Sequence, residues 1–190
     1  MSLKYCSSCG SLLNFMVPVG DQLPRGVCPS CEKIHYENPK VVTGCLVESD
    51  SKVLLCRRAI EPRIGFWTFP AGYLEMNEST QAGAIRETKE EAGADVQIEQ
   101  LYALFDLPYI SQIYMFYKAS LQSFSFTASS ETTEARFFSE EEIPWDQLAF
   151  KVVTETLNWF FEDRKTSDFA MHTMVINHPT LKKLSAPSST

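Results

Sequence analysis

Three glutamates near the middle of the chain have a spacing suited to metal-ion chemistry. Glu87, Glu90 and Glu91 stand at positions i, i+3 and i+4 of a segment with helical character. On an α-helix this spacing places the three carboxylates on one face. Gly83 and Ala84 lie on or beside that face without bulk, so a ligand could approach it closely. Like charges at this spacing weaken a helix by only ~0.2–0.5 kcal/mol per pair, so a solvated acidic face is the alternative reading.

A magnesium ion is the ligand that such a face would suit. Magnesium takes oxygen ligands and usually combines one or two carboxylates with waters and substrate phosphate oxygens. The loop from Gly72 to Asn77 precedes the helix, and a main-chain carbonyl from it could complete the coordination sphere. Spacing alone leaves both readings open.

Four cysteines near the N-terminus form a second chemical pattern. They occur as two CxxC pairs separated by 18 residues, at positions Cys6, Cys9, Cys28 and Cys31. Two such turns let four thiolates converge on a tetrahedral zinc ion, and a site closed in this way is structural because it has no open coordination position. A disulfide framework fits poorly with a chain that shows no secretory signal. We expect Cys45 and Cys56, which lie in apolar strands, to be small core residues.

The composition predicts a globular protein with an acidic surface. The 190 residues are 44% hydrophobic and 22% charged, and the net charge is −7. A surface of this sign gives no footprint for duplex nucleic acid, which basic proteins bind. No apolar run approaches the ~18–20 residues of a membrane span, and no signal peptide is visible, so we expect a cytoplasmic protein without a membrane partner.

The elements that must position these groups follow an α+β order. We expect a helix capped by Asn77 and ended by Gly93, with Ile85, Thr88 and Ala92 packing its inner side. A second amphipathic helix is expected with its inner side at Val153, Leu157, Phe160 and Phe161. Strands are expected at residues 41–47, 53–56, 66–69, 96–104, 111–119 and 134–138, and a last strand is possible between Phe169 and Ile176.

The glutamate helix and the loop before it resemble a known signature. The pattern Gly72-x5-Glu78-x7-Arg86-Glu87-Thr88-x-Glu90-Glu91-x-Gly93-Ala94 is similar to the Nudix box, and every charged and glycine position of the box is filled. Only Thr88 and Ala94 depart from it, at positions where the family usually has a bulky aliphatic residue. The chain therefore resembles a Nudix hydrolase that carries an N-terminal zinc ribbon.

This resemblance implies a fold, a cofactor and a set of catalytic residues. It implies an α/β/α sandwich with a mixed sheet, and it divides the chain into a ribbon (1–36), a Nudix domain (37–165) and a C-terminal extension (166–190) that is partly tail. Magnesium or manganese would be held by Glu87, Glu90, Glu91 and the Gly72 carbonyl, with zinc in the ribbon. Arg86 and Glu78 would support the loop and helix by ion pairing. The general base would be Glu91 or a glutamate of a later loop, for which Glu131 is the candidate.

The substrate is a question of subfamily. Segments 36–40, 66–75 and 138–150 resemble Nudix proteins that cleave FAD or ADP-ribose, while the Ser-Gln-Pro-Trp-Pro-Phe-Pro signature of NADH pyrophosphatases is absent. Arg58 could clamp a phosphate, and Phe66 and Trp67 could stack against a base or flavin, as could Tyr73, Tyr109 and Tyr114.

The expected activity is therefore magnesium-dependent hydrolysis of the pyrophosphate of a nucleoside diphosphate derivative, FAD or ADP-ribose first. NADH and dinucleoside polyphosphates are the alternatives within the enzyme class. The rival class is a non-catalytic regulator that binds ADP-ribose or nucleic acid, and the intact box argues against it. A small nucleotide is the expected partner, and the sequence allows a homodimer. His35, His172 and His178 show no metal-ligand spacing.

Overall fold

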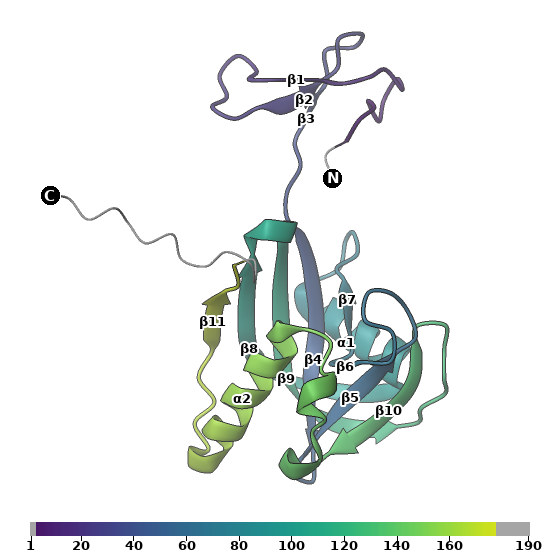
Figure 1. The fold of residues 1–190 in the computed structure, drawn as a ribbon, viewed down its shortest axis with the longest axis vertical. Helices are drawn as coiled ribbons and strands as arrows, with labels where there is room; N and C mark the ends of the chain where they lie inside the picture. Colours follow the sequence, from purple (N-terminus) through teal and green to yellow (C-terminus); the bar gives the residue numbers. More distant parts are fainter. Residues whose placement is uncertain (1–2, 178–190) are drawn as a thin grey trace, which may run out of the picture. The chain divides into compact units, whose positions relative to one another are not determined.

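The structure, a computed structural model, describes residues 3–177 (Figure 1). It divides the chain into two compact units, Met1–Pro39 and the part from Lys40 onward. The sequence suggested boundaries after residues 36 and 165. The structure places the division between the two units after Pro39, and the second unit includes a strand beyond residue 165, His172–Val175. The expected tail at residues 184–190, and His178 with Pro179, lie outside the described residues.

The N-terminal unit is a three-stranded antiparallel sheet with a very small core. Its strands are β1 (Asn14–Met16), β2 (Arg25–Val27) and β3 (Ile34–His35), in the order β1-β2-β3. The buried apolar cluster consists of Cys6, Leu13 and Cys28. Two of these three are cysteines, so the unit lacks the apolar core that would hold so short a chain without a metal or disulfides.

The second unit is built on an eight-stranded mixed sheet. Its main path runs β10-β5-β4-β9-β8-β11, and β6 and β7 pair with β5 and β4. The β4–β9 and β11–β8 pairs are parallel, and the others are antiparallel. The strands are β4 (Lys40–Ser49), β5 (Lys52–Arg58), β6 (Trp67–Thr68), β7 (Ala71–Tyr73), β8 (Ala94–Leu107), β9 (Gln112–Phe124), β10 (Thr132–Phe138) and β11 (His172–Val175).

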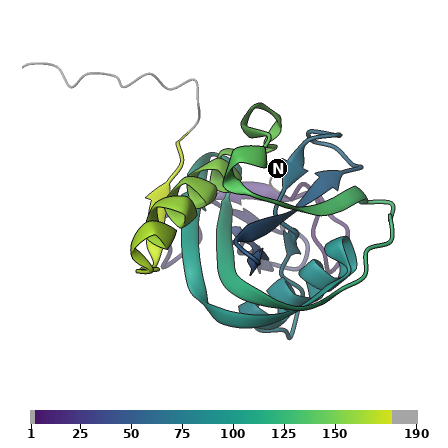
Figure 2. The ribbon, with the colours of Figure 1, turned by 90° about the horizontal axis from the view of Figure 1, so that it is seen from below.

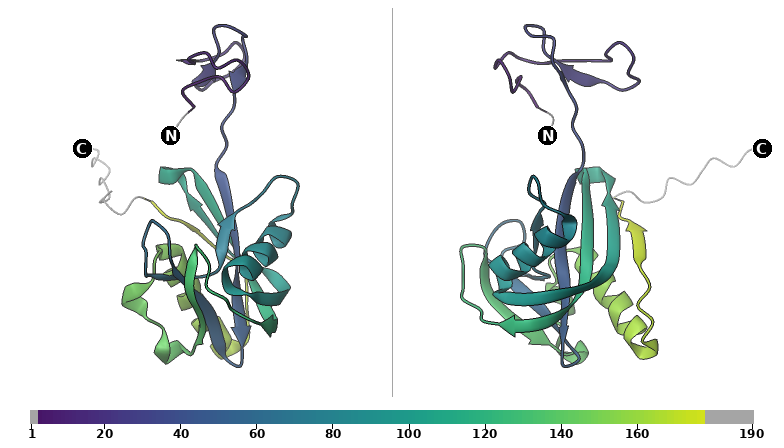
Figure 3. Two further views of the ribbon diagram at one scale, coloured as in Figure 1. Left: turned by 90° about the vertical axis from the view of Figure 1, so that its right-hand side faces the viewer. Right: turned by 180° about the vertical axis from the view of Figure 1, so that it is seen from behind.

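Two α-helices cover opposite faces of this sheet, as Figures 2 and 3 show. Helix α1 (Thr80–Ala92) contributes Ala84 and Ala92 to one apolar cluster, and α2 (Lys151–Thr166) contributes to the other. All four residues expected on the inner side of α2 are buried: Val153, Leu157, Phe160 and Phe161. The α/β/α sandwich with a mixed sheet is thus confirmed. Short 3₁₀ turns lie at Pro108–Ile110, Glu140–Glu142 and Trp145–Gln147.

Strands β4 and β5 form a hairpin whose two strands separate from each other away from the turn. They pair only at Glu48–Val53 and Ser49–Lys52, next to the turn, and beyond it β7 pairs with β4 and β6 with β5. A Cβ on Gly44 would lie 2.3 Å from the Pro70 carbonyl oxygen, so only glycine lets this inserted segment cross β4. The insertion carries residues 71–73 to the side of α1.

The N-cap of helix α1 lies two residues later than the sequence suggested. Ser79 is its N-cap, because the Ser79 side chain accepts a hydrogen bond from the Ala82 amide, while Asn77 has φ +67° in the loop before it. Its end at Gly93, with φ +65°, agrees with the prediction. The inner side includes Thr88 and Ala92 as expected, but Ile85 is exposed, and that part of the packing prediction was wrong.

The last described strand adds an edge to the sheet. Strand β11 runs parallel to β8, and Ile176 just beyond it is buried and donates its amide to the Asp106 carbonyl at 2.8 Å. Asp163 of α2 accepts hydrogen bonds from Tyr102 of β8 and lies 2.7 Å from Nε2 of His172. These contacts tie β11 to both α2 and β8. Within residues 3–177, no helix is long and apolar enough to cross a membrane.

Candidate active site

A cleft of about 1010 Å³ lies in the second unit where several strand ends meet. Its walls come from α1, β7, the β5–β6 loop, the starts of β9 and α2, and the residues after β11. The three glutamates of α1 all line it, together with Gly72, Arg86 and Glu131. The structure therefore brings the expected metal ligands and both candidate bases into one cleft.

Arg86 is the hub of the carboxylate cluster. Its guanidinium binds Glu78 bidentately, with Nη2–Oε1 at 2.7 Å and Nε–Oε2 at 3.1 Å. Its Nη1 donates to Glu87 at 2.7 Å and to Glu90 at 3.2 Å, and Nη2 also reaches the Tyr73 carbonyl at 3.3 Å. One arginine thus fixes the loop and two of the three glutamates in place, which is the geometry that a guanidinium fork favours.

The loop before α1 is held against the remaining carboxylates. The amide of Ala71 donates to Oε2 of Glu91 at 2.8 Å, and the amide of Glu75 donates to Glu78 at 2.7 Å. A Cβ on Gly72 would lie 2.4 Å from the Glu87 carboxyl group. No side chain fits between the Gly72 backbone and Glu87, so the main chain at Gly72 and this carboxylate lie close together.

Partly buried carboxyl groups lie close together in the cleft. Burial raises the pKa of Glu91 to about 8, and the neighbouring Glu87 and Glu131 add to the rise. Burial also raises the pKa of Glu87, although Arg86 opposes the shift. Carboxylates held together in this way gain most from a cation that neutralises them.

The residues present fit a hard divalent cation. The donors are carboxylate oxygens of Glu87, Glu90 and Glu91 and the backbone of Gly72, all in one water-accessible cleft, and magnesium or manganese prefers such oxygen ligands. Thiolate and imidazole groups, which select softer metals, are missing from the described lining of the cleft.

Arg58 lines the cleft but is largely engaged by the β5–β6 loop. Its Nε donates to the Pro62 carbonyl at 2.8 Å, and Nη2 lies 3.4 Å from the carbonyls of Ile60 and Glu61. Its guanidinium also covers the ring of Phe150 at 5.1 Å. Arg58 therefore shapes a wall of the cleft, and its use as a phosphate clamp remains a prediction.

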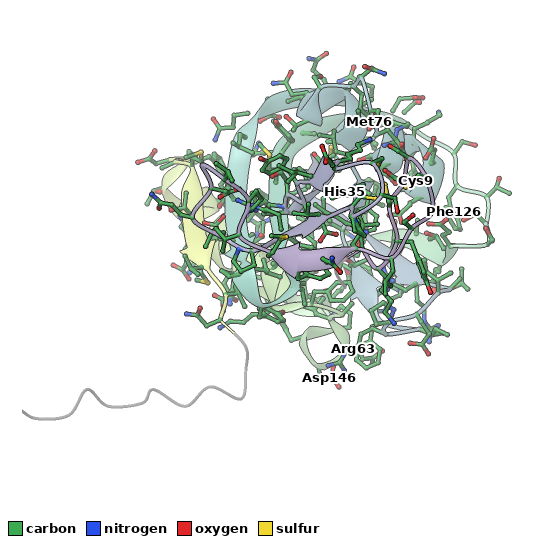
Figure 4. The ribbon with its side chains drawn as sticks, turned by 90° about the horizontal axis from the view of Figure 1, so that it is seen from above. Cys9, His35, Arg63, Met76, Phe126 and Asp146 are labelled. Carbon is green, nitrogen blue, oxygen red and sulfur yellow. The ribbon has the colours of Figure 1, made fainter. Side chains whose placement is uncertain are left out.

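The two aromatic residues expected to stack on a substrate lie elsewhere. Neither Phe66 nor Trp67 is among the residues that line the cleft. Trp67 is 6% exposed and packs edge-on against Phe138 at 4.8 Å, and Phe66 has Arg63, labelled in Figure 4, over its ring. Their proposed contact with substrate gains no support from these positions.

Other aromatic and polar residues line the cleft in their place. They are Tyr73, Tyr109, Gln112, Tyr114, Phe150 and Asn177. The three tyrosines were candidates from their nearness to the box. Gln112, Phe150 and Asn177 were missed, because only the pairing of distant strands brings the starts of β9 and α2 and the end of β11 together.

The cysteine pairs converge in the N-terminal unit. Their four sulfurs lie within 4.8 Å of one another, with Cys6–Cys31 at 3.6 Å and Cys9–Cys28 at 3.4 Å. Bonds of ~2.3 Å from zinc to four tetrahedral sulfurs imply S–S separations of about 3.8 Å, so the cluster fits zinc. All six cysteines of the chain lie within the described residues and are free thiols.

Each pair sits in the same kind of turn. The amide of Gly10 donates to the Cys6 carbonyl, and the amide of Glu32 donates to the Cys28 carbonyl. The Ser8 amide also points at the Cys6 sulfur and contributes most to lowering the pKa of that thiol to about 5, which favours the thiolate that zinc requires. Nε2 of His35 lies 3.4 Å from the same sulfur, a neighbour that sequence spacing did not reveal. Figure 4 labels Cys9 and His35 in this unit.

Comparison with protein families accounts for nearly all of the described chain. A model described as the NUDIX domain matches residues 38–160, and a model described as the Nudix N-terminal zinc ribbon matches residues 4–37. The two matches meet close to the boundary that the structure places at Pro39.

Similar proteins include both solved structures and characterised enzymes. A NUDIX hydrolase from Nitrosomonas europaea is 48% identical, with a TM-score of 0.89 over 93% of this chain and 100% of that one. An ADP-ribose pyrophosphatase from Methanocaldococcus jannaschii is 27% identical over 65% of this chain and 76% of its own length. An NAD-capped RNA hydrolase from Stutzerimonas stutzeri is 28% identical over 74% of this chain, which spans only 50% of that relative.

Proposed function

The chain belongs to the Nudix family of hydrolases, and we propose that this member hydrolyses the diphosphate linkage of ADP-ribose or of an NAD-related dinucleotide, FAD included. The observation that carries the proposal is that Glu87 and Glu90, held by Arg86, and Glu91, held by the Ala71 amide, line one cleft together with Gly72. Non-catalytic binding would not require such a cluster to be intact.

The chain's own groups have distinct tasks in this reaction. Glu87, Glu90, Glu91 and the Gly72 carbonyl would hold magnesium or manganese, which supplies charge neutralisation for the diphosphate and a more acidic attacking water. Arg86 and Glu78 keep the ligands in position before substrate arrives, so little reorganisation is needed in the transition state.

The general base is one of two carboxylates in the cleft. Glu91 is held by the Ala71 amide, and Glu131 lies in the loop just before β10, where the Ala59 amide donates to its carbonyl. The two carboxylates interact electrostatically, since the negative charge of Glu131 contributes to the raised pKa of Glu91. If Glu131 is the base, Glu131→Gln should lower kcat while leaving the affinity for Mg²⁺ within about twofold.

The preferred substrates carry an adenosine diphosphate joined to a second group. The likeness to an ADP-ribose pyrophosphatase and the missing NADH-type signature favour ADP-ribose and FAD over NADH. The likeness to an NAD-capped RNA hydrolase favours the opposite ranking. A pocket that merely tolerates the far group discriminates by only ~1–3 kcal/mol, so we expect overlapping activities with a ranking.

The test is a comparison of kcat/KM for ADP-ribose, FAD, NADH and a dinucleoside polyphosphate at one Mg²⁺ concentration, with products identified. AMP with ribose 5-phosphate, or AMP with FMN, should be the main products. Glu91→Gln is the matched negative control. A value for NADH more than about tenfold above both ADP-ribose and FAD would overturn the ranking, and no cleavage of any diphosphate would overturn the activity.

We also propose one structural zinc held by Cys6, Cys9, Cys28 and Cys31, a cytoplasmic location, and a homodimer as an assembly worth testing. The sulfur geometry supports the zinc. The other two statements rest on composition and family resemblance, and cell fractionation and light scattering would test them.

A further inference from the structure

One wall of the cleft comes from a part of the chain that lies beyond the family match. The NUDIX model matches residues 38–160, whereas Ile176 and Asn177, which follow β11, also line the cleft. Every residue proposed to act in the reaction lies within the match. The shared part of a fold carries the shared reaction, so a wall added beyond it is suited to recognising what differs between substrates.

Strand β11 is anchored at both of its ends. Nε2 of His172 lies 2.7 Å from Oδ2 of Asp163 in α2, and the Tyr102 hydroxyl donates to the same oxygen at 2.8 Å. The ring of His172 also stacks on Trp159, with 4.6 Å between the ring centroids. After the strand, Ile176 is buried and its amide donates to a carbonyl of β8. The next residue is therefore presented to the cleft from a fixed segment.

Asn177 offers the cleft a carboxamide that no described residue binds. The described lining contains two carboxamide side chains, Gln112 and Asn177. Nε2 of Gln112 donates to the Tyr73 hydroxyl at 3.0 Å. Asn177 is exposed, and nothing within residues 3–177 forms a hydrogen bond with its side chain. A carboxamide has two N–H donors and a carbonyl acceptor, so it can both donate to and accept from hydroxyl groups of a ligand.

Asn177 is remote from the carboxylates that would hold the metal. Strands β11, β8, β9, β4 and β7 follow one another across the sheet, with β11 at its edge (Figure 1), and Gly72 lies in β7. Four strand spacings of ~4.8 Å separate β11 from β7 by roughly 15–20 Å. This span leaves room for a diphosphate and a sugar, so Asn177 would contact a substrate away from the bond that breaks.

We propose that Asn177 is a specificity-determining residue, whose carboxamide hydrogen-bonds the hydroxyl groups of the second sugar of the substrate, with His172 as the positioning residue of its strand. The proposal rests on the proposed function, because the proposed substrates share adenosine diphosphate and differ in the group joined to the second phosphate. ADP-ribose carries a ribose there and FAD a ribityl chain, so both present hydroxyls. Asn177 then affects affinity for the second group and takes no part in hydrolysis.

Two ligands that differ only in the second group test this role by binding alone. One is ADP-ribose with a methylene group in place of the oxygen that bridges its phosphates, and the other is the same diphosphonate with a methyl ester in place of the ribose. Dissociation constants would be measured by calorimetry on the full chain with Mg²⁺ present. The variant is Asn177→Ala. Val175→Thr is the matched control, since Val175 belongs to the same strand and is 54% exposed but does not line the cleft.

Asn177→Ala should weaken binding of the ribose analogue by about fivefold, the size expected for one or two neutral hydrogen bonds, and leave the methyl ester within about twofold. Val175→Thr should match wild type with both ligands. Equal losses for the two ligands would place Asn177 at the adenosine or diphosphate instead and overturn the assignment. An unchanged affinity for the ribose analogue, or a wild type that binds neither ligand, would also overturn it.

The role of His172 is tested by His172→Phe, which keeps a ring to stack on Trp159 and removes the contact with Asp163. Loosening β11 should lower affinity for the ribose analogue more than for the methyl ester, and unchanged or equal losses would refute the positioning role. If His172→Phe does not fold, Tyr102→Phe makes the same test, because it removes the other hydrogen bond to Asp163. Cleavage of ADP-ribose itself is measured separately. The selective pattern in a protein that cleaves no diphosphate would refute the proposed activity alone, whereas cleavage without the pattern would refute the role of Asn177 alone.

Discussion

Gly72→Ala is a single-methyl change that should separate folding from catalysis. The added Cβ would lie 2.4–2.5 Å from the Glu87 carboxyl carbon and oxygens, whereas ordinary contacts begin at 3.4 Å. The Glu87 carboxylate must therefore move by about 1 Å. It is the far end of a flexible side chain, so the backbone can stay in place. Gly72 does not have the positive φ that strains an alanine.

Gly72→Ala should lower the turnover rate without lowering the stability of the fold. A misplacement of ~1 Å in a catalytic constellation can lower the rate by about 100-fold. Replacing glycine by alanine at a compatible backbone position changes stability by ~0.4–1 kcal/mol in the favourable direction, through the unfolded state. We expect kcat with ADP-ribose to fall by about 100-fold, the Mg²⁺ concentration for half-maximal rate to rise, and the melting temperature in EDTA to stay level or increase.

A double-mutant cycle tests whether Glu87 transmits the effect. In a Glu87→Ala background the methyl group of Gly72→Ala meets no carboxylate, so the second change should alter kcat by less than about twofold. Equal losses from Gly72→Ala in both backgrounds would show that the methyl group acts elsewhere. A Gly72→Ala enzyme with near-normal kcat and Mg²⁺ dependence would refute the packing argument itself.

Three further outcomes follow from the site and from the N-terminal unit. Glu90→Gln and Glu91→Gln should each lower turnover by orders of magnitude with the far-ultraviolet spectrum unchanged, and a folded Glu91→Gln enzyme with normal kcat would exclude Glu91 as a ligand. In EDTA, the pKa of Glu91 near 8 lies above its ordinary 4.5, so the folded state holds a proton that the unfolded state releases, and stability should fall as the pH rises from about 4.5 to 8. Thermal melts should show Glu91→Gln gaining on the wild type across that range, and parallel curves would contradict it. Elemental analysis should give about one zinc per chain, with Cys28→Ser losing the metal while retaining diphosphate cleavage, and metal-free wild type would disprove the zinc site.

Local patterns were enough to predict the parts of the site that are close in sequence. Glu87, Glu90 and Glu91 share one helical turn, and Gly72 and Glu78 lie in the loop just before it, so their meeting follows from helix geometry and loop length. The start of α1 was harder to predict from the sequence. Asn77 and Ser79 are both good capping residues, and only the left-handed backbone of Asn77 decides for Ser79.

Contacts between distant segments were beyond the reach of sequence patterns. Trp67 was expected at the substrate because it is aromatic and close to the box, but a two-residue strand gives no periodicity from which to infer the face it presents. Asn177 reaches the cleft only because β11 pairs in parallel with β8. That pairing joins residues about 70 positions apart, and no spacing rule predicts it.

Strand β11 has a consequence for how the protein behaves in concentrated solution. Its four residues cover part of the outer edge of β8, a 14-residue strand whose backbone groups would otherwise face the solvent unpaired. Open edges of long strands recruit other chains by intermolecular pairing, and proteins protect them with short added strands. The His172–Asp163–Tyr102 contacts fasten that protection to the body of the domain. The same short segment that brings Asn177 to the cleft therefore also protects this edge of the sheet against pairing with other chains.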